Sequence, residues 1–397
     1  MTELPLAPAA RIPMTDTYHG VDVTEDYRWL EDASSKEAIT WTKAQQQRTR
    51  AYFDGIPCRD ALRARVEQLL KAERTTYKQL LPGGSAFFAL KAQTPRQQPF
   101  VVALTDLDDP ATERVVVDPD AIDPSGETAI DFFVPSPDGR QIAVSLSEHG
   151  NEDGSLYVYD TDSGKVVDEP IPHVNLMGGS VAWRHDGSGF WYTRCADPAG
   201  FRQQVWFREL GGAPDHVDLA GGFADERIAE NYLSASPDGR WVMDRVQKGD
   251  GGEWQVFLRS QGADGSWWQV AGIPDKCVHA VLGADALYLL SRRDAPHGKV
   301  LRLPVTGGAT VADAHEIVPA SDLVIEDLAV TRDTVWVADM DGGPQQMRTF
   351  DTNGRPLAAV EIPPMTSVSA APLVSRRLDR TGSRGRASPS PSRRPGG

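Results

Sequence analysis

Serine residues flanked by glycine are the first candidates for chemistry, because a nucleophilic serine can sit in a Gly-x-Ser-x-Gly turn that exposes its hydroxyl group. The nearest strings are Gly-Gly-Ser-Val-Ala at residues 178–182 and Gly-Ser-Gly at residues 187–189. Neither string places a glycine both two residues before and two residues after the serine. The sequence therefore predicts no catalytic residue.

The histidines give no pattern that binds a metal. The eight of them are scattered singly, with neither His-Glu-x-x-His nor clustered Cys, His and Asp spacing. We therefore predict no metal site and no cofactor-binding residue. His185 beside Asp186 could form part of a catalytic dyad, but it lies in a repeated turn where the other copies carry proline, so a turn role is preferred.

Acidic side chains on one polar loop could in principle supply paired carboxylates for acid–base work. Glu148 precedes His149, and Glu152 precedes Asp153, directly after an apolar run. A solvated hairpin loop is the preferred interpretation. Tryptophans that recur in apolar runs could likewise form a peptide or sugar platform, but packing between sheets explains them better.

Composition limits the classes of partner. The 397 residues carry a formal charge of −15, which argues against nucleic-acid binding, because phosphate binding needs clustered Lys and Arg. No apolar run approaches the length of a membrane span. The three cysteines, Cys58, Cys195 and Cys277, are odd in number and far apart, so we expect them to be reduced and buried in a cytoplasmic protein.

Helical signals are confined to residues 34–74. Ser34 followed by Glu37 is typical of a capping box, and Gly55 with Pro57 ends the first helix. Leu62, Val66, Leu69 and Leu70 then share one face of a second helix. This pattern predicts a helical hairpin.

Short alternating runs take over from Tyr77 and predict strands at hairpin spacing. Three turns repeat among them, namely Ser-Pro-Asp-Gly-Arg at 136–140, Arg-His-Asp-Gly-Ser at 184–188 and Ser-Pro-Asp-Gly-Arg at 236–240. Their spacing of about 50 residues, each unit a small antiparallel sheet, is typical of a β-propeller. We count six units between Thr75 and Pro364 and the start of a seventh at Thr366–Ser369. The predicted fold is mainly β, of the seven-bladed propeller type with an incomplete last blade and an N-terminal helical segment.

Residues 376–397 differ abruptly from the rest of the chain. They contain seven Arg and one Asp among many Ser, Pro and Gly residues. A segment with so few apolar residues cannot bury enough surface to become ordered, so we expect a disordered basic tail. An RNA-binding or membrane-binding role is a weaker alternative. Out-of-frame reading of GC-rich codons yields the same residue types, so we interpret the tail as a frameshift product.

The N-terminal string at residues 16–32, Asp-Thr-Tyr-His-Gly-Val-Asp-Val-Thr-Glu-Asp-Tyr-Arg-Trp-Leu-Glu-Asp, closely resembles the opening signature of the prolyl oligopeptidase family of serine peptidases. Strings at 117–119, 136–148 and 181–194 resemble the propeller domain of the same family. One departure is Glu25-Asp26, where the family usually has Asp-Pro before the tyrosine. The resemblance covers roughly residues 12–370.

The resemblance implies a propeller that gates a serine endopeptidase acting on short, proline-containing peptides. It also implies an α/β-hydrolase domain with a Ser-Asp-His triad as the intramolecular partner. None of these triad residues can be assigned here, so we expect the chain to be inactive alone, as a truncated peptidase. The alternative is a free-standing propeller used as a binding scaffold. The expected organisation is an N-terminal extension (1–74), a propeller with a truncated seventh blade (75–375) and the tail (376–397).

Overall fold

The computed structural model describes residues 8–176, 178–197, 200–219, 228–249, 251–262, 265–363 and 365–368. The chain divides into two compact units, Met1–Glu73 and Arg74–Gly397, which we call the N-terminal unit and the propeller unit. The expected basic tail at 376–397 lies outside the described residues.

The N-terminal unit begins with a β-hairpin that the sequence analysis missed. Strands β1 (Met14–Tyr18) and β2 (Val21–Glu25) pair antiparallel across a two-residue loop. His19 and Gly20 in this loop both have positive φ, at 51° and 81°. Two positive φ values are the requirement of the type I′ turn that joins tight hairpins. The family signature therefore coincides with a structural element.

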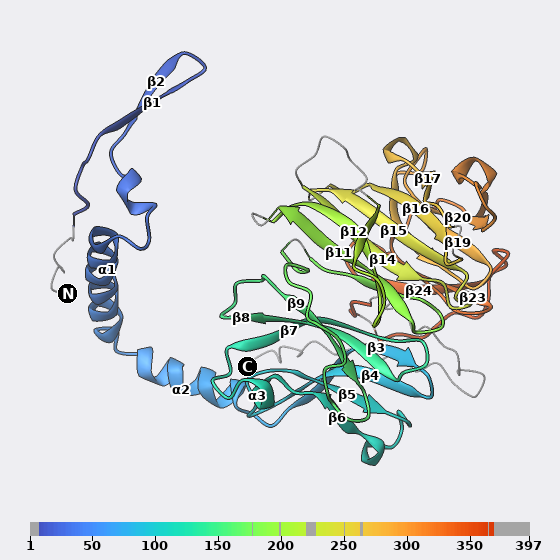
Figure 1. Cartoon of the computed structure of the whole chain (residues 1–397), viewed down its shortest axis with the longest axis horizontal. Coiled ribbons are helices and arrows are strands. Elements are labelled where there is room, and N and C mark those ends of the chain that lie inside the picture. Colours follow the sequence, from blue (N-terminus) through green and yellow to red (C-terminus); the bar gives the residue numbers. More distant parts are fainter. Residues whose placement is uncertain are drawn as a thin grey trace, which may run out of the picture. The chain divides into compact units, whose positions relative to one another are not determined.

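Two helices follow, as expected. Helix α1 (Lys36–Asp54) begins after Ser35, whose hydroxyl accepts a hydrogen bond from the amide of Ala38 at 3.1 Å. The expected cap at Ser34 is thus wrong by one residue, because the Ser34 hydroxyl donates to Asp32 instead. Helix α2 spans Arg59–Leu70. Figure 1 shows α2 leading away from the end of α1 rather than folding back along it, so the two helices are present but the expected helical hairpin is wrong. Leu62, Val66, Leu69 and Leu70 of α2 are exposed, so no apolar contact draws α2 back onto α1.

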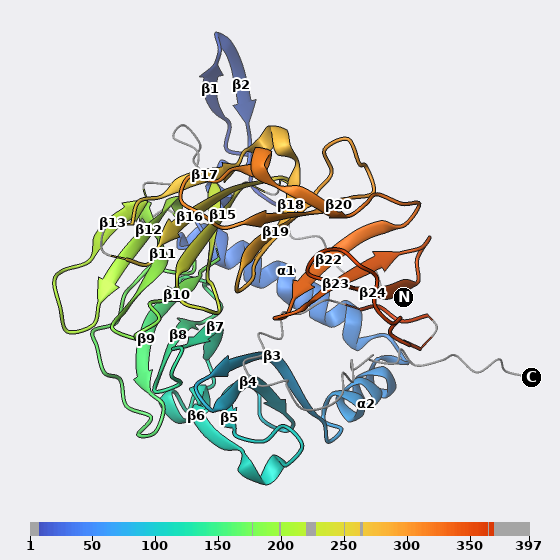
Figure 2. The ribbon, with the colours of Figure 1, turned by 90° about the vertical axis from the view of Figure 1, so that its right-hand side faces the viewer.

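The described part of the propeller unit contains six antiparallel sheets, in which strands consecutive in sequence are neighbours in space. Figure 2 shows the sheets side by side around a centre. The strands are β3 (Thr75–Gly83), β4 (Ala86–Gln93), β5 (Phe100–Leu104) and β6 (Arg114–Val117) in sheet 1; β7 (Thr128–Pro135), β8 (Gln141–Glu148) and β9 (Ser155–Asp160) in sheet 2; β10 (Val181–Trp183), β11 (Gly189–Asp197), β12 (Phe201–Glu209) and β13 (His216–Leu219) in sheet 3; β14 (Ala229–Ala235), β15 (Trp241–Lys248), β16 (Trp254–Ser260) and β17 (Trp268–Ala271) in sheet 4; β18 (Cys277–Leu282), β19 (Ala286–Ser291), β20 (Lys299–Pro304) and β21 (His315–Val318) in sheet 5; and β22 (Val324–Val330), β23 (Thr334–Met340) and β24 (Gln345–Asp351) in sheet 6. A short helix, α3 (Pro119–Ile122), joins sheets 1 and 2. The expected mainly β propeller fold is confirmed.

The repeated turns have the predicted geometry. In the first, the Gly139 amide donates to the carbonyl of Ser136 at 2.9 Å, and Gly139 has a φ of 74°. The Ser136 hydroxyl donates to the Asp138 carboxylate at 2.7 Å. The copy at 236–240 repeats these bonds, and the copy at 184–188 keeps the same glycine conformation. The turn sequence thus reverses the chain between the first and second strands of a sheet.

Sheets 2 and 6 have a weak fourth strand. In sheet 2, Leu156 and Tyr159 of β9 form single bridges to Ile171 and Val166 in the segment that follows. In sheet 6, Met347 and Phe350 of β24 form single bridges to Val360 and Pro356 in the segment that follows. Prolines in both outer segments lack the amide that a longer ladder needs. The expected seventh unit is described only over residues 365–368, where the Thr366 carbonyl accepts from the Gln345 amide.

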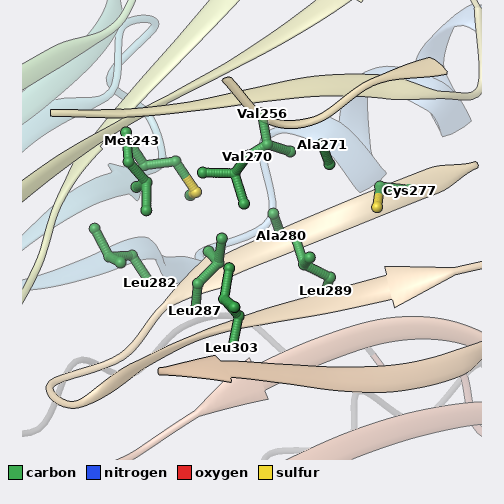
Figure 3. Close-up of a cluster of buried hydrophobic side chains, with 11 residues drawn as sticks. Met243, Val256, Val270, Ala271, Cys277, Ala280, Leu282, Leu287, Leu289 and Leu303 are labelled. Atoms are coloured by element: carbon green, nitrogen blue, oxygen red, sulfur yellow. The ribbon is translucent and has the colours of Figure 1, made fainter. Parts of the chain in front are cut away.

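The apolar core lies between successive sheets rather than within one centre. Figure 3 shows the cluster between sheets 4 and 5, where Met243 and Val256 meet Leu287 and Leu289. Other clusters join sheets 1 and 2, 2 and 3, 3 and 4, and 5 and 6. Tryptophans pack here as expected, and Trp183 and Trp191 are almost fully buried. Each sheet is therefore stabilised mainly by its neighbours.

Candidate functional site

The serines in the two glycine-flanked strings are used structurally. The Ser180 hydroxyl donates to the carbonyl of Asn231 at 3.1 Å and accepts from the amide of Leu233 at 2.9 Å. It therefore joins sheet 3 to sheet 4. The Ser188 hydroxyl donates to Asp186 within its own turn. Neither serine hydrogen-bonds a histidine that could act as a base, which is the arrangement a serine nucleophile requires.

His185 lies in the turn of sheet 3, as expected. Its amide donates to the side-chain carbonyl of Gln261 at 2.8 Å. A Cβ atom added to Gly239 would lie only 2.2 Å from the imidazole, so His185 covers the corresponding turn of sheet 4. The imidazole is therefore part of the contact between two turns.

The loop carboxylates do not form a catalytic pair. Nδ1 of His149 pairs with Glu127 at 2.9 Å, while Asp153 pairs with Nδ1 of His173, also at 2.9 Å. The sequence analysis did not connect His173 with this loop, since the two partners are 20 residues apart. In the described residues no group of His, Cys, Asp and Glu could hold a metal ion.

The cysteines are unpaired, but one departs from the expectation of burial. Cys195 and Cys277 are buried, and burial raises the pKa of Cys195 to about 11 and that of Cys277 to about 12. These two thiols are therefore protonated and unreactive at neutral pH. Cys58 is exposed, because it lies just before α2 in a unit that has almost no core.

Asp244 in β15 is a fully buried carboxylate at the boundary of sheets 3 and 4. Its side chain has no exposed surface, and neither oxygen has a hydrogen-bond partner among the described residues. Burial raises its pKa to about 8, while the neighbouring Arg245 and the backbone at Tyr232 act in the opposite direction. Asp244 is thus mostly neutral at pH 7. Adjacent charged residues within the apolar run of β15 were a signal that the sequence analysis overlooked.

Arg245 faces the other side of the same sheet and contacts two further sheets through His279. Its Nη1 lies 3.0 Å from Nδ1 of His279 in β18, and Nε2 of His279 lies 3.8 Å from Asp327 in β22. The guanidinium also lies over the Trp254 ring, 5.2 Å from its centroid. No sequence pattern could have revealed the contacts among Arg245, His279 and Asp327. Successive members are 34 and 48 residues apart, and they come together only because sheets 4, 5 and 6 are neighbours in the propeller.

The N-terminal unit presents an apolar surface. Thirteen large apolar side chains are exposed in residues 8–73, whereas the other described residues, about four times as many, expose eleven. Ala38 is the only buried apolar residue among those described in this unit. All four apolar residues expected to line α2 are exposed, with Leu70 at 71%. The apolar side chains that would form a core in an ordinary domain are therefore exposed in this unit.

A depression of about 460 Å³ lies on the same unit, between the N-terminal segment and the start of α1. Trp29 and Trp41 line it, with their rings edge to face at 6.5 Å. The Trp29 indole donates to the carbonyl of Ala10, whereas the buried Trp41 indole nitrogen has no hydrogen-bond partner in the described residues.

This ring of sheets and its N-terminal unit match a known family. Residues 8–375 match the model described as the N-terminal β-propeller domain of prolyl oligopeptidase. The chain belongs to the prolyl oligopeptidase family. In the described residues, none of the helices of this family member is long and apolar enough to cross a membrane.

Curated relatives in the prolyl oligopeptidase family are similar over most of this chain. The prolyl endopeptidase of Elizabethkingia meningoseptica is 22% identical over 368 residues, which cover 89% of this chain and 50% of that protein. Prolyl oligopeptidase A of Galerina marginata is 22% identical, over 81% of this chain and 48% of its own length. The chain therefore spans about half the length of these relatives.

Solved structures of prolyl oligopeptidases share the fold. A prolyl endopeptidase structure from a study of inter-domain dynamics has a TM-score of 0.77 at 23% identity, over 91% of this chain and 53% of that one. Prolyl oligopeptidase B of Galerina marginata, bound to a 35-residue hydrolysis and macrocyclization substrate, has a TM-score of 0.74 at 15% identity, over 89% of this chain and 53% of that one. At these identities the likeness concerns the fold.

Proposed function

We propose that this chain is the gating propeller of a serine endopeptidase that acts on short, proline-containing peptides. The observation that carries the proposal is the match of residues 8–375 to the propeller domain of prolyl oligopeptidase. In this proposal the acylation chemistry belongs to an α/β-hydrolase domain that packs with the chain, because Ser180 and Ser188 donate to a carbonyl and a carboxylate rather than to a histidine. The propeller acts by steric exclusion, admitting short peptides and keeping longer polypeptides away from the active site.

The apolar surface of the N-terminal unit supports a docking role. Apolar side chains on α2 and on the β1–β2 hairpin remain exposed, as a surface completed by another domain would be. The depression lined by Trp29 and Trp41 adds two aromatic rings to this surface. We propose that this surface packs against the hydrolase domain. A cytoplasmic location is also part of the proposal and is supported by the three free cysteines.

A binding measurement tests the docking role. The hydrolase half of a family peptidase, expressed without its propeller, is titrated with this chain and the complex is followed by analytical ultracentrifugation. We expect Leu62→Glu and Leu69→Glu on α2 to weaken binding at least tenfold, because each buries a charge in the interface. Val166→Glu, at an exposed apolar position of the propeller unit, is the matched control and should have little effect. Equal binding by all variants would contradict docking through α2.

A further inference from the structure

Three side chains from three successive sheets form a line across the propeller unit. Arg245 belongs to β15 in sheet 4, His279 to β18 in sheet 5 and Asp327 to β22 in sheet 6. The Arg245 Nη1 to His279 Nδ1 distance is 3.0 Å, and the His279 Nε2 to Asp327 Oδ1 distance is 3.8 Å. The imidazole therefore lies between a cation on one neighbouring sheet and an anion on the other.

Chemistry decides which nitrogen of His279 carries the proton. A guanidinium remains protonated at any physiological pH and can only donate. Nδ1 must therefore accept the hydrogen bond from Arg245, which requires a neutral imidazole with its proton on Nε2. This proton then faces the carboxylate of Asp327. A second proton could be added only at Nδ1, directly against the guanidinium.

The surrounding residues hold His279 in this position. β18 departs from regular register between Cys277 and His279, and the carbonyl of Val278 at this bulge accepts from the Trp254 indole at 3.0 Å. The Trp254 ring in turn lies under the Arg245 guanidinium. The β-bulge between Cys277 and His279 thus turns the His279 side chain toward Arg245, as β-bulges commonly redirect a side chain.

The charged groups around the line favour the neutral form of His279. Burial lowers its pKa, the Arg245 charge lowers it further, and Asp327 together with the backbone at Leu328 raises it. The charge of Arg245 is itself favoured by Asp327 and Tyr232 and, from the opposite face of the sheet, by Asp244. The net effect on His279 is a pKa below its ordinary value of 6.5.

We propose that His279 is a pH-sensitive latch between the sheets of this propeller. In the neutral state it accepts the hydrogen bond of Arg245 and links sheet 5 to sheet 4. In the protonated state it can no longer accept, is repelled by Arg245 and is attracted to Asp327 on sheet 6. Protonation therefore exchanges the partner of sheet 5 and loosens its contact with sheet 4.

The sign of the pH dependence follows from linkage. Because the pKa of His279 is lower in the folded chain than in the unfolded chain, the unfolded state binds more protons between these two values. The stability contributed by His279 is present above about pH 6.5 and is lost as the pH falls through the folded-state pKa. The latch thus opens in acid.

Urea unfolding at pH 8 and pH 5.5 tests the latch. His279→Asn keeps an oxygen that can accept from Arg245 but removes the titrating ring. We expect the unfolding equilibrium constant of the wild type to rise several-fold more on acidification than that of His279→Asn, which should resemble the wild type at pH 8. His315→Asn, an exposed position of the same sheet, is the control and should behave as the wild type. An identical acid response in all three proteins would overturn the proposal.

A measurement on the wild type keeps the test independent of folding of the variant. Long-range ¹H–¹⁵N correlation spectra of histidine-labelled protein at pH 8 distinguish a protonated from an unprotonated ring nitrogen. We expect one buried histidine with an unprotonated Nδ1 and a protonated Nε2, and this resonance should titrate below the exposed histidines. A His279 ring that is protonated on Nδ1 at pH 8 would contradict the latch directly.

Discussion

Asp244 and Arg245 are neighbours in β15 but face opposite sides of sheet 4. Asp244 shares its face with Val242, which packs toward sheet 3, whereas Arg245 shares its face with Met243, which packs toward sheet 5. The alternation of a strand thus places an acid and a base in two different inter-sheet contacts. Asp244 is fully buried and titrates near neutral pH, whereas Arg245 keeps its charge, so of these two groups only Asp244 contributes to the pH dependence of the fold.

Asp244 should make the protein less stable as the pH rises. Its folded-state pKa of about 8 lies above the ordinary value of 3.8, so the folded chain holds a proton that the unfolded chain releases. The stability that depends on this proton is fully present below about pH 4 and is lost as the pH rises through 8. We expect Asp244→Asn to remove this slope and to stabilise the fold at pH 8.5 by on the order of a few kcal/mol.

Urea midpoints measured from pH 5 to pH 8.5 check this prediction. Asp333→Asn, at an exposed position in the turn between β22 and β23, is the control and should leave the slope unchanged. A slope that persists in Asp244→Asn would mean that Asp244 is ionised in the folded chain.

The hydrogen bonds and the ion pair of Asp218 should be among the polar contacts between sheets 3 and 4 that contribute most to stability. Its Oδ2 accepts from the indoles of Trp191 and Trp267, each at 2.8 Å, and lies 3.3 Å from Nε of Arg259. Asp218→Ala leaves these donors without a partner, and we expect a loss of about 3 kcal/mol. Asp162→Ala, which removes an exposed ion pair with Arg114, should cost less than about 0.5 kcal/mol. Comparable losses in the two variants, by thermal or urea unfolding, would contradict this ranking.

The glycines of the repeated turns should not be equivalent to other glycines with positive φ. Gly139 has a φ of 74°, and a Cβ atom there would lie 2.4 Å from the carbonyl oxygen of Gly83, where β3 of sheet 1 ends at its turn. Gly211 has a φ of 64° but nothing within 4 Å of an added Cβ. We expect Gly211→Ala to cost about 1 kcal/mol from backbone strain, and Gly139→Ala clearly more. Equal unfolding midpoints for the two variants would show that the turns do not pack against each other.

The N-terminal unit should be held less firmly than the sheets. Its helices lack a buried apolar core, and most of the stability of a protein helix comes from tertiary packing. Hydrogen exchange followed by mass spectrometry should show α1 and α2 exchanging at least tenfold faster than β8 and β19, whose residues are mostly buried. Equal protection in helices and sheets would mean that the unit does not need a partner to be stable.

The sequence predicted the elements that rest on local signals. The strand around Ile142 and the turn at Ser136 follow from alternation and from turn chemistry, which act over a few residues. Helix α1 was predicted too, although its cap lies at Ser35, because Ser34 and Ser35 are equally good caps and Asp32 decides between them.

Contacts between sheets could not be predicted in the same way. The pairing of Arg245 with His279 depends on a bulge in β18 and on the angle between two sheets, neither of which leaves a local pattern. The dipeptide His19-Gly20 was a signal for the turn between β1 and β2. The strands themselves gave no signal, because both are exposed and show no apolar alternation. What was missed therefore concerns the arrangement of elements rather than their identity.

Activity with and without a hydrolase domain tests the central claim most directly. We would compare this chain alone with a chimera that joins it to the hydrolase half of the Elizabethkingia meningoseptica prolyl endopeptidase, using a capped Gly-Pro reporter peptide and a long unfolded polypeptide as substrates. We predict no turnover by the chain alone, and turnover of the reporter but not of the polypeptide by the chimera. Reporter turnover by the chain alone, or equal cleavage of both substrates by the chimera, would contradict the gating role.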